Sequence, residues 1–128
     1  MEEFLEKVNP KQKKYFMQLR SQLRNLPDVE ETIEIDEISG EWCPVYRVKG
    51  SDLVWVHFDE HLWLNFPVEP KFEKKALQDE NLESRMIECV KDAEETSGEK
   101  WATVELKSGD QVDQVLPLLE LRHSVLTS

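Results

Sequence analysis

The sequence is poor in cysteine and glycine and has no long hydrophobic run, and each shortage excludes a class of protein. A membrane-spanning helix needs about 20 consecutive apolar residues, and no such stretch occurs. Cys43 and Cys89 stand alone, without the paired spacing of a disulfide framework or a zinc ribbon. With only four glycines, the chain contains neither a glycine-rich phosphate loop nor the G-x-S-x-G motif of serine hydrolases. The sequence therefore offers no known catalytic signature.

Basic residues are also scarce, since 16 Lys and Arg face 27 Asp and Glu and leave a net charge of −11. Nucleic-acid phosphates require a basic surface, so tight binding to duplex DNA is not expected. The acidic segment Met1–Glu6 lacks the basic-then-apolar order of a signal peptide, which predicts a cytoplasmic protein. A length of 128 residues fits one domain, spanning residues 1–128.

The first long helix is predicted to begin at Pro10, with Asn9 as its N-cap. Apolar residues then recur with helical spacing at Phe16, Leu19 and Leu23, and Pro27 follows the end of the pattern. The stripe predicts a helix that packs one side against the core.

Alternating apolar and polar residues predict three consecutive strands over 45–48, 53–58 and 62–66. One face of these strands is expected to pack on helices, and it carries Val45, Val54, Val56, Phe58, Leu62, Leu64 and Phe66. The other face carries Tyr46, Trp55, His57, Trp63 and Asn65.

The remaining elements complete an α+β domain. A strand is predicted over 32–36, a helix over 71–79, a strand over 101–106 and a closing helix over 112–125. Residues 82–92 fit either a helix or a strand. We predict an antiparallel sheet with the N- and C-terminal helices packed on one face.

The aromatic row is the candidate binding surface, formed by Tyr46, Trp55, His57 and Trp63. Two interpretations are open: a helix covers the row and makes it core, or the helices cover the aliphatic side and leave it exposed. Exposed aromatic patches mark interaction sites, so we take these four residues as partner-binding.

Metal and cofactor sites are not predicted. His57 and His61 are metal-ligating residue types, but strand parity puts His57 on the outer face and His61 in a turn. Zinc requires three or four converging ligands.

Three short strings stand out in the sequence: Leu26-Pro27-Asp28-Val29-Glu30-Glu31, Pro44-Val45-Tyr46-Arg47-Val48-Lys49-Gly50 and Trp101-Ala102-Thr103-Val104-Glu105-Leu106. They resemble the MmcQ/YjbR family of small bacterial proteins. The resemblance implies a CyaY/frataxin-like fold and no established reaction, and a nucleic-acid-binding role has been inferred for some members from their shape. The chain departs from the pattern in its last helix, where Arg122-His123 replaces a Ser-Tyr pair.

The functional expectation is a non-enzymatic binding protein that acts on an unknown protein or small ligand as a monomer or weak homodimer. The first alternative is nucleic-acid binding through the basic first helix, which carries Lys11, Lys13, Lys14, Arg20 and Arg24. The second, suggested by the frataxin-like resemblance, is weak iron binding through the carboxylates Glu30, Glu31, Glu34, Asp36 and Glu37.

Overall fold

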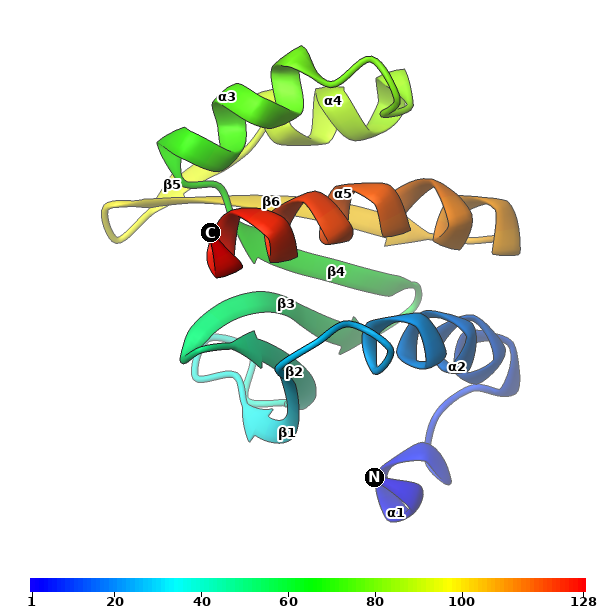
Figure 1. Ribbon diagram of the computed structural model, residues 1–128. Helices are drawn as coiled ribbons and strands as arrows, with labels where there is room; N and C mark the ends of the chain where they lie inside the picture. The colour runs from blue at the N-terminus through cyan, green and yellow to red at the C-terminus, as the bar shows by residue number, and fades with distance from the viewer.

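Five helices and six strands follow one another in the computed structural model, which describes residues 1–128 (Figure 1). The helices are α1 (Glu2–Leu5), α2 (Pro10–Leu23), α3 (Pro70–Gln78), α4 (Ser84–Lys91) and α5 (Gly109–Thr127). The strands are β1 (Val29–Ile35), β2 (Trp42–Val48), β3 (Ser51–Phe58), β4 (Leu62–Pro67), β5 (Glu94–Thr96) and β6 (Glu99–Leu106). They form one antiparallel sheet in the order β1-β2-β3-β4-β6-β5.

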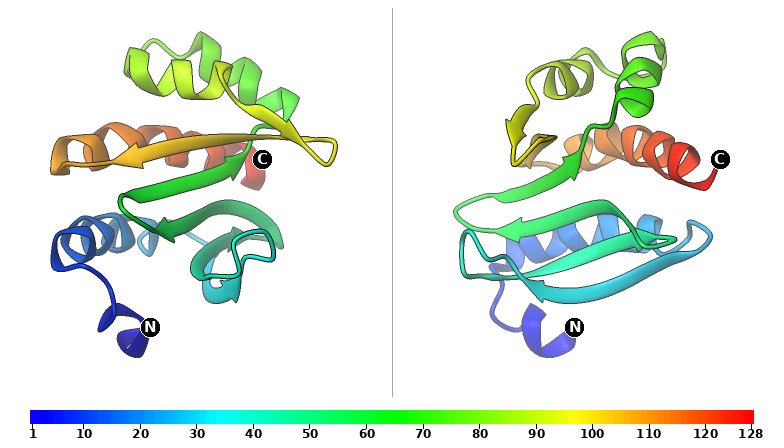
Figure 2. Two further views of the ribbon diagram at one scale, coloured as in Figure 1. Left: turned by 180° about the vertical axis from the view of Figure 1, so that it is seen from behind. Right: turned by 90° about the vertical axis from the view of Figure 1, so that its left-hand side faces the viewer.

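The two long helices lie on the same face of this sheet, as predicted. Helices α2 and α5 contact each other; β6 crosses in front of α5 in one view (Figure 2, left), and strands β1–β3 lie in front of α2 in the other (Figure 2, right). Helix α3 packs on α5 and α4, and α4 also contacts β6, the strand next to the β5 edge of the sheet. None of the five helices is both long and apolar enough to span a bilayer.

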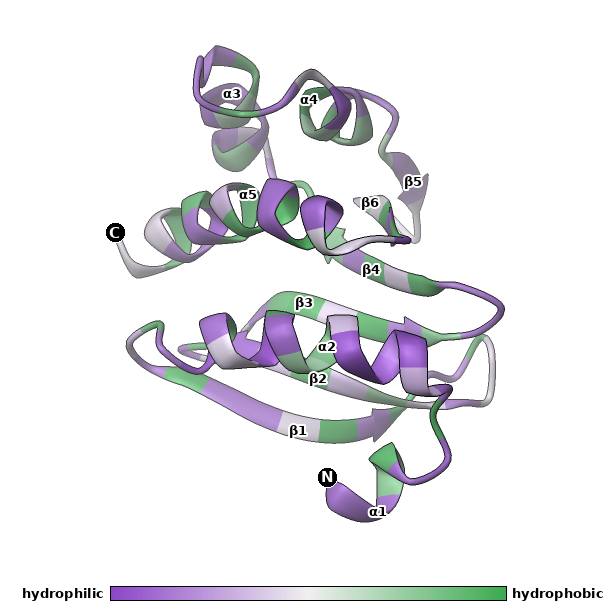
Figure 3. Cartoon of the chain, turned by 90° about the vertical axis from the view of Figure 1, so that its right-hand side faces the viewer, coloured by the Kyte–Doolittle hydropathy of each residue, from purple (hydrophilic) through white to green (hydrophobic).

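Helix α2 begins as the sequence predicts. The Asn9 side chain accepts a hydrogen bond from the backbone N–H of Lys11 at 2.8 Å, and Pro10 occupies the first helical position. Phe16, Leu19 and Leu23 are fully buried. Hydrophilic and hydrophobic bands alternate along α2 in Figure 3, as expected for a helix that buries one side.

The core lies between the helices and one face of the sheet, which we call the helix-covered face; the opposite one is the outer face. On the helix-covered face, Val54, Val56, Leu62, Leu64 and Phe66 are fully buried, and they belong to a cluster of 25 buried apolar residues. The prediction that these five residues face the helices is confirmed.

The expected faces of Tyr46 and Val45 are wrong. A β-bulge interrupts the pairing of β2 with β3 beside Tyr46, so that Tyr46 pairs with Val54 and lies fully buried on the helix-covered face. Val45 instead pairs with Trp55 on the outer face, although it too is fully buried. The bulge shifts the register by one residue, which reverses the faces of the residues before it.

The ambiguous segment 82–92 contains helix α4, with Met86 and Val90 buried. It leads into the short strand β5, which pairs with β6 through a turn at Ser97 and Gly98. Both turn residues have positive φ angles, 54° and 84°, as a tight hairpin turn requires.

A buried arginine joins α5 to the sheet. The guanidinium of Arg122, completely inaccessible to solvent, donates hydrogen bonds to the carbonyls of Leu53, Asp52 and Pro67 and to a carboxylate oxygen of Glu69. This group satisfies the carbonyls at the ends of β3 and β4 and fixes α5 across them.

Candidate functional site

A concave pocket of about 690 Å³ opens on the outer face, within the range of small-molecule sites. Its floor comes from three adjacent strands: Trp55 and His57 of β3, Asn65 of β4, and Trp101 and Thr103 of β6. The turn after β1 forms one wall, and the end of α4 with the β5–β6 hairpin forms the other; the wall residues are Asp36, Ile38, Cys89, Asp92, Glu94, Thr96, Ser97 and Glu99.

The charge of this lining is entirely of one sign. Four carboxylates, those of Asp36, Asp92, Glu94 and Glu99, border the pocket, and no Lys or Arg does. Together with the net charge of −11, they give the pocket a negative potential that attracts cations and disfavours anions.

The Trp55 indole is held in place by its neighbours. Its Nε1–H donates to Asp52 Oδ2 at 3.2 Å, and the Arg47 guanidinium lies over its ring at 5.8 Å from the centroid. Arg47 in turn forms ion pairs with Glu34 and Asp52. The tryptophan therefore presents a fixed half-buried surface to the pocket, with little entropy left to lose on binding.

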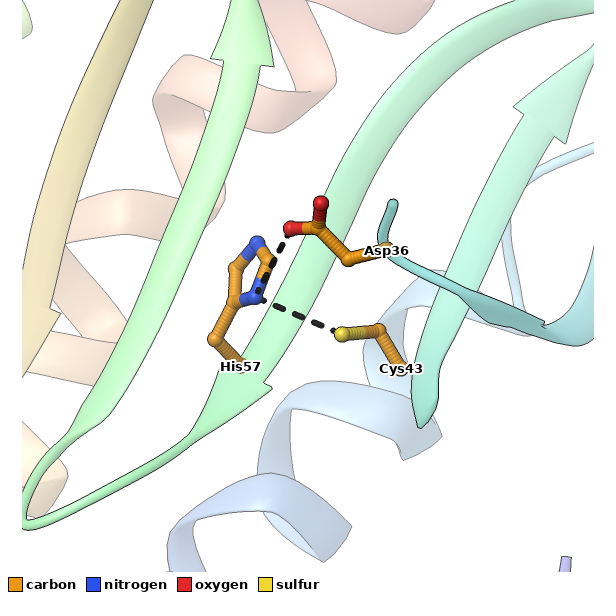
Figure 4. Close-up of side chains that lie close together, drawn as sticks. All are labelled: Asp36, Cys43 and His57. Carbon is orange, nitrogen blue, oxygen red and sulfur yellow. Dashed lines mark hydrogen bonds and ion pairs between the residues drawn. The ribbon is translucent and has the colours of Figure 1, made fainter. Parts of the chain in front are cut away.

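Three side chains of different chemistry converge at one edge of the pocket (Figure 4). The Sγ of Cys43 on β2 lies 3.3 Å from Nδ1 of His57 on β3, and Oδ2 of Asp36 lies 3.7 Å from the same nitrogen. All three ligand-type atoms fall within 4.8 Å of one another.

The turn that carries Asp36 orients its carboxylate. The backbone N–H of Ile38 donates to Asp36 Oδ1 at 2.9 Å, which leaves Oδ2 directed toward His57. The turn closes through hydrogen bonds from Asp36 N–H to the Glu41 carbonyl and from Gly40 N–H to the Asp36 carbonyl.

The protonation of this cluster does not suit nucleophilic catalysis. Burial, with Asp36 and Glu41 nearby, raises the pKa of the Cys43 thiol to about 12. Burial also lowers the pKa of His57, although Asp36 opposes the change. Moreover, the thiol and the carboxylate contact the same imidazole nitrogen, whereas a catalytic triad uses both nitrogens.

A second hollow, of about 1150 Å³, lies between α1 and the edge formed by β1 and β2. Phe4, Trp42 and Phe58 line it, with acidic and basic side chains at its margin. The outer-face pocket contains His57 and Cys89, whose pKa values burial lowers and raises, respectively. Shifted groups concentrate at functional sites, so the outer-face pocket is the stronger candidate.

Of the four predicted site residues, two line the pocket. Trp55 and His57 form part of its floor, whereas Trp63 lies on the same face outside it, with its ring 6.2 Å from that of His61. Tyr46 belongs to the core, where its hydroxyl donates to Glu31 at 2.6 Å.

The two histidines considered as a metal pair have separate partners. His57 contacts Cys43 and Asp36, while His61 contacts Glu105 at 3.4 Å. His61 therefore contributes nothing to the cluster at the pocket edge.

The charged residues of the two alternative functions are partly neutralised within the chain. Arg20 of α2 makes two hydrogen bonds to Glu31 at 2.8 and 2.9 Å, and Arg47 pairs with Glu34. Lys11, Lys13 and Lys14 are exposed. One positive charge of α2, that of Arg20, is thus neutralised by the adjacent strand β1.

Sequence reasoning missed Trp101, Asp36 and Cys43 as parts of one site. Trp101 was placed correctly in a strand, but nothing in the sequence shows that its strand lies beside β4. Cys43 and His57 meet only because the bulge sets the register of β2 on β3.

Comparison of the chain with protein-family models, curated proteins and solved structures returns no significant match, so the resemblance to the MmcQ/YjbR family stays a prediction and the function is argued from the site.

Proposed function

We propose that this chain is a non-enzymatic binding protein whose outer-face pocket holds a positively charged ligand of small-molecule or short-peptide size. The observation that carries the proposal is the lining: it includes four carboxylates and two tryptophans, and no Lys or Arg is part of it.

Both parts of the lining favour cations. A cationic group over an indole face gains about 0.5–2 kcal/mol from the ring quadrupole, depending on how far it is desolvated. Carboxylates on opposite walls supply charge-assisted hydrogen bonds to ammonium or guanidinium N–H groups. The Arg47 guanidinium already lies over the Trp55 ring, whereas no cation of the protein lies over the ring of Trp101.

Calorimetric titration tests the proposal with spermidine and arginine methyl ester as cationic probes and glutarate as an anionic one. We expect saturable binding of a cation that weakens as salt rises, and no binding of glutarate. Trp101→Ala and Glu99→Gln should each weaken the cation's binding several-fold.

Trp63→Ala is the matched control, because it removes a tryptophan from the same face but outside the pocket. It should leave binding unchanged. Failure of both cationic probes to bind, or equal losses in the Trp63 and Trp101 variants, would contradict the proposed function.

A further inference from the structure

We infer that Asp36, Cys43 and His57 form a binding site for a divalent transition metal of the zinc class. Each residue contributes one ligand atom, a carboxylate oxygen, a thiolate sulfur and an imidazole nitrogen. This inference does not rest on the proposed function: the two share Asp36 as a lining carboxylate, but the metal needs Cys43 and His57, whereas the organic cation needs the tryptophans.

Two of the three spacings between ligand atoms fit tetrahedral coordination, and the third is no more than 4.8 Å. Zinc bonds of about 2.0–2.3 Å place neighbouring ligand atoms about 3.3–3.8 Å apart. The sulfur and the oxygen lie 3.3 and 3.7 Å from His57 Nδ1, so little rearrangement is needed to enclose a metal. Figure 4 shows both directed at that nitrogen.

The surroundings hold the ligands in this arrangement. Cys43 and His57 lie on adjacent strands of the sheet, and the hydrogen bond from Ile38 fixes the Asp36 carboxylate. The site is also shielded, because Cys43 is buried and the side chains of His57 and Asp36 are only 17% and 21% exposed. A metal held by a rigid, partly dry set of ligands is bound more tightly than by exposed carboxylates.

The choice of metal follows from the donors. Thiolate and imidazole favour zinc, cobalt and copper over magnesium and calcium, which prefer oxygen ligands alone. On binding, the Cys43 S–H bond breaks, the sulfur bonds to the metal, and the proton passes to solvent. Three protein ligands leave a fourth position, which faces the pocket because Asp36 and His57 line it while Cys43 does not.

Cobalt(II) absorption provides the test, on protein freed of any purification tag. We expect a thiolate-to-cobalt charge-transfer band that saturates at one equivalent and is displaced by zinc. The band should vanish in Cys43→Ser, and calorimetry should show at least a tenfold loss of zinc affinity in His57→Gln and in Asp36→Asn.

Cys89→Ser is the matched control, because Cys89 is the other free thiol and is half-buried in the pocket wall. Its band should equal that of the wild type. In case Cys43→Ser does not fold, wild-type NMR supplies a second readout: zinc should shift the His57 ring signals and leave those of His61 unchanged. Absence of the band in the wild type, its persistence in folded Cys43→Ser, or shifts at His61 instead of His57 would overturn the inference. None of these outcomes depends on whether spermidine binds.

Discussion

Alternate residues of the same strands serve different ends on the two faces of the sheet. In β3, Val54 and Val56 are fully buried on the helix-covered face, whereas Trp55 and His57, which alternate with them, remain partly accessible on the outer face. The first pair contributes to stability by leaving water. The second pair contributes to a surface that can still exchange water for a ligand. Substitutions at neighbouring positions of β3 should therefore have different effects: those on the helix-covered face should lower stability, and those on the outer face should weaken ligand binding.

The arginines of the two faces show the same contrast. Arg122 is enclosed by backbone carbonyls, Glu69 and the rings of Phe66 and Phe72, at 5.7 and 5.0 Å from the ring centroids. Arg47 lies on the outer face with its side chain 27% exposed, so water competes for its ion pairs. Comparing the loss of stability when each arginine is removed therefore tests whether the polar contacts of the two faces differ in strength.

The largest effect is expected from Arg122→Ala. Loss of the guanidinium leaves several buried carbonyls without donors, and breaking a buried charged network costs about 3–5 kcal/mol. Arg47→Ala, the control on the outer face, should cost about 1 kcal/mol or less. Urea unfolding measures both. Equal losses of stability would show that the two faces do not differ in this way.

The next effect compares neighbours in β3. Val56→Ala removes two buried methyl groups and leaves a cavity, which should lower the free energy of unfolding by about 2–3 kcal/mol. Trp55→Ala removes a half-buried ring, one partly buried hydrogen bond and one cation–π contact, and should cost about 1 kcal/mol. Spermidine binding should follow the opposite order, lost in the Trp55 variant and kept in the Val56 variant. A Trp55 variant as unstable as the Val56 variant would assign Trp55 to the core.

A smaller effect tests the corrected position of Tyr46. Tyr46→Phe deletes a hydroxyl that donates to the Glu31 carboxylate, and should cost about 1–2 kcal/mol without affecting spermidine binding. Tyr15→Phe is the control, because Tyr15 is half-buried and its hydroxyl makes no hydrogen bond within the protein. Unchanged stability with weakened binding would instead return Tyr46 to the outer face.

The smallest effect concerns acid stability. Hydrogen bonds from Arg20 chiefly, and from Tyr46, lower the pKa of Glu31 in the folded state below its ordinary value of 4.5. The stabilisation contributed by ionised Glu31 is therefore fully present above about pH 5, and it is lost as the pH falls through the folded-state pKa of Glu31.

Glu31→Gln should accordingly lower the unfolding free energy at neutral pH and flatten its decline in acid. Glu34→Gln is the outer-face comparison: Arg47 chiefly lowers the pKa of Glu34, but its side chain is more exposed, at 34% against 19% for Glu31. Unfolding followed from neutral pH to about pH 3 should show the larger change in the Glu31 variant. A larger change in the Glu34 variant would indicate that the ion pairs of the outer face contribute more to the stability lost in acid.

The fold could be predicted because its signals are local. The cap at Asn9, the helical stripe that follows it and the period-2 alternation of 53–58 and 62–66 each arise within a few residues. The face of Tyr46 could not, since it depends on one irregularity. In a regular hairpin Tyr46 would pair with Leu53, but Leu53 is the extra residue of a bulge and Tyr46 pairs with Val54. Leu53 and Val54 are therefore both buried in the core.

The site was harder to predict because it is assembled from distant segments. Trp55 and His57 could be placed on one face from alternation alone. Trp101 lies at least 44 residues further along the chain. It comes close to them only because β6 pairs with β4, although α3 and α4 separate these strands in the sequence. The cluster of Asp36, Cys43 and His57 depends on the conformation of a turn and on the bulge, neither of which leaves a pattern in the sequence.

The central claim is that the outer-face pocket is the binding surface, and the four tryptophan indole N–H signals in an NMR spectrum test it most directly. Spermidine added to the wild type should shift the signals of Trp55 and Trp101, which line the pocket. Trp63, outside the pocket on the same face, and Trp42, in the second hollow, should not move. Assignment by single Trp→Phe variants makes the result unambiguous. Shifts confined to Trp42 or Trp63, or no shift at any indole up to about 1 mM, where binding is worth about 4 kcal/mol, would contradict the claim.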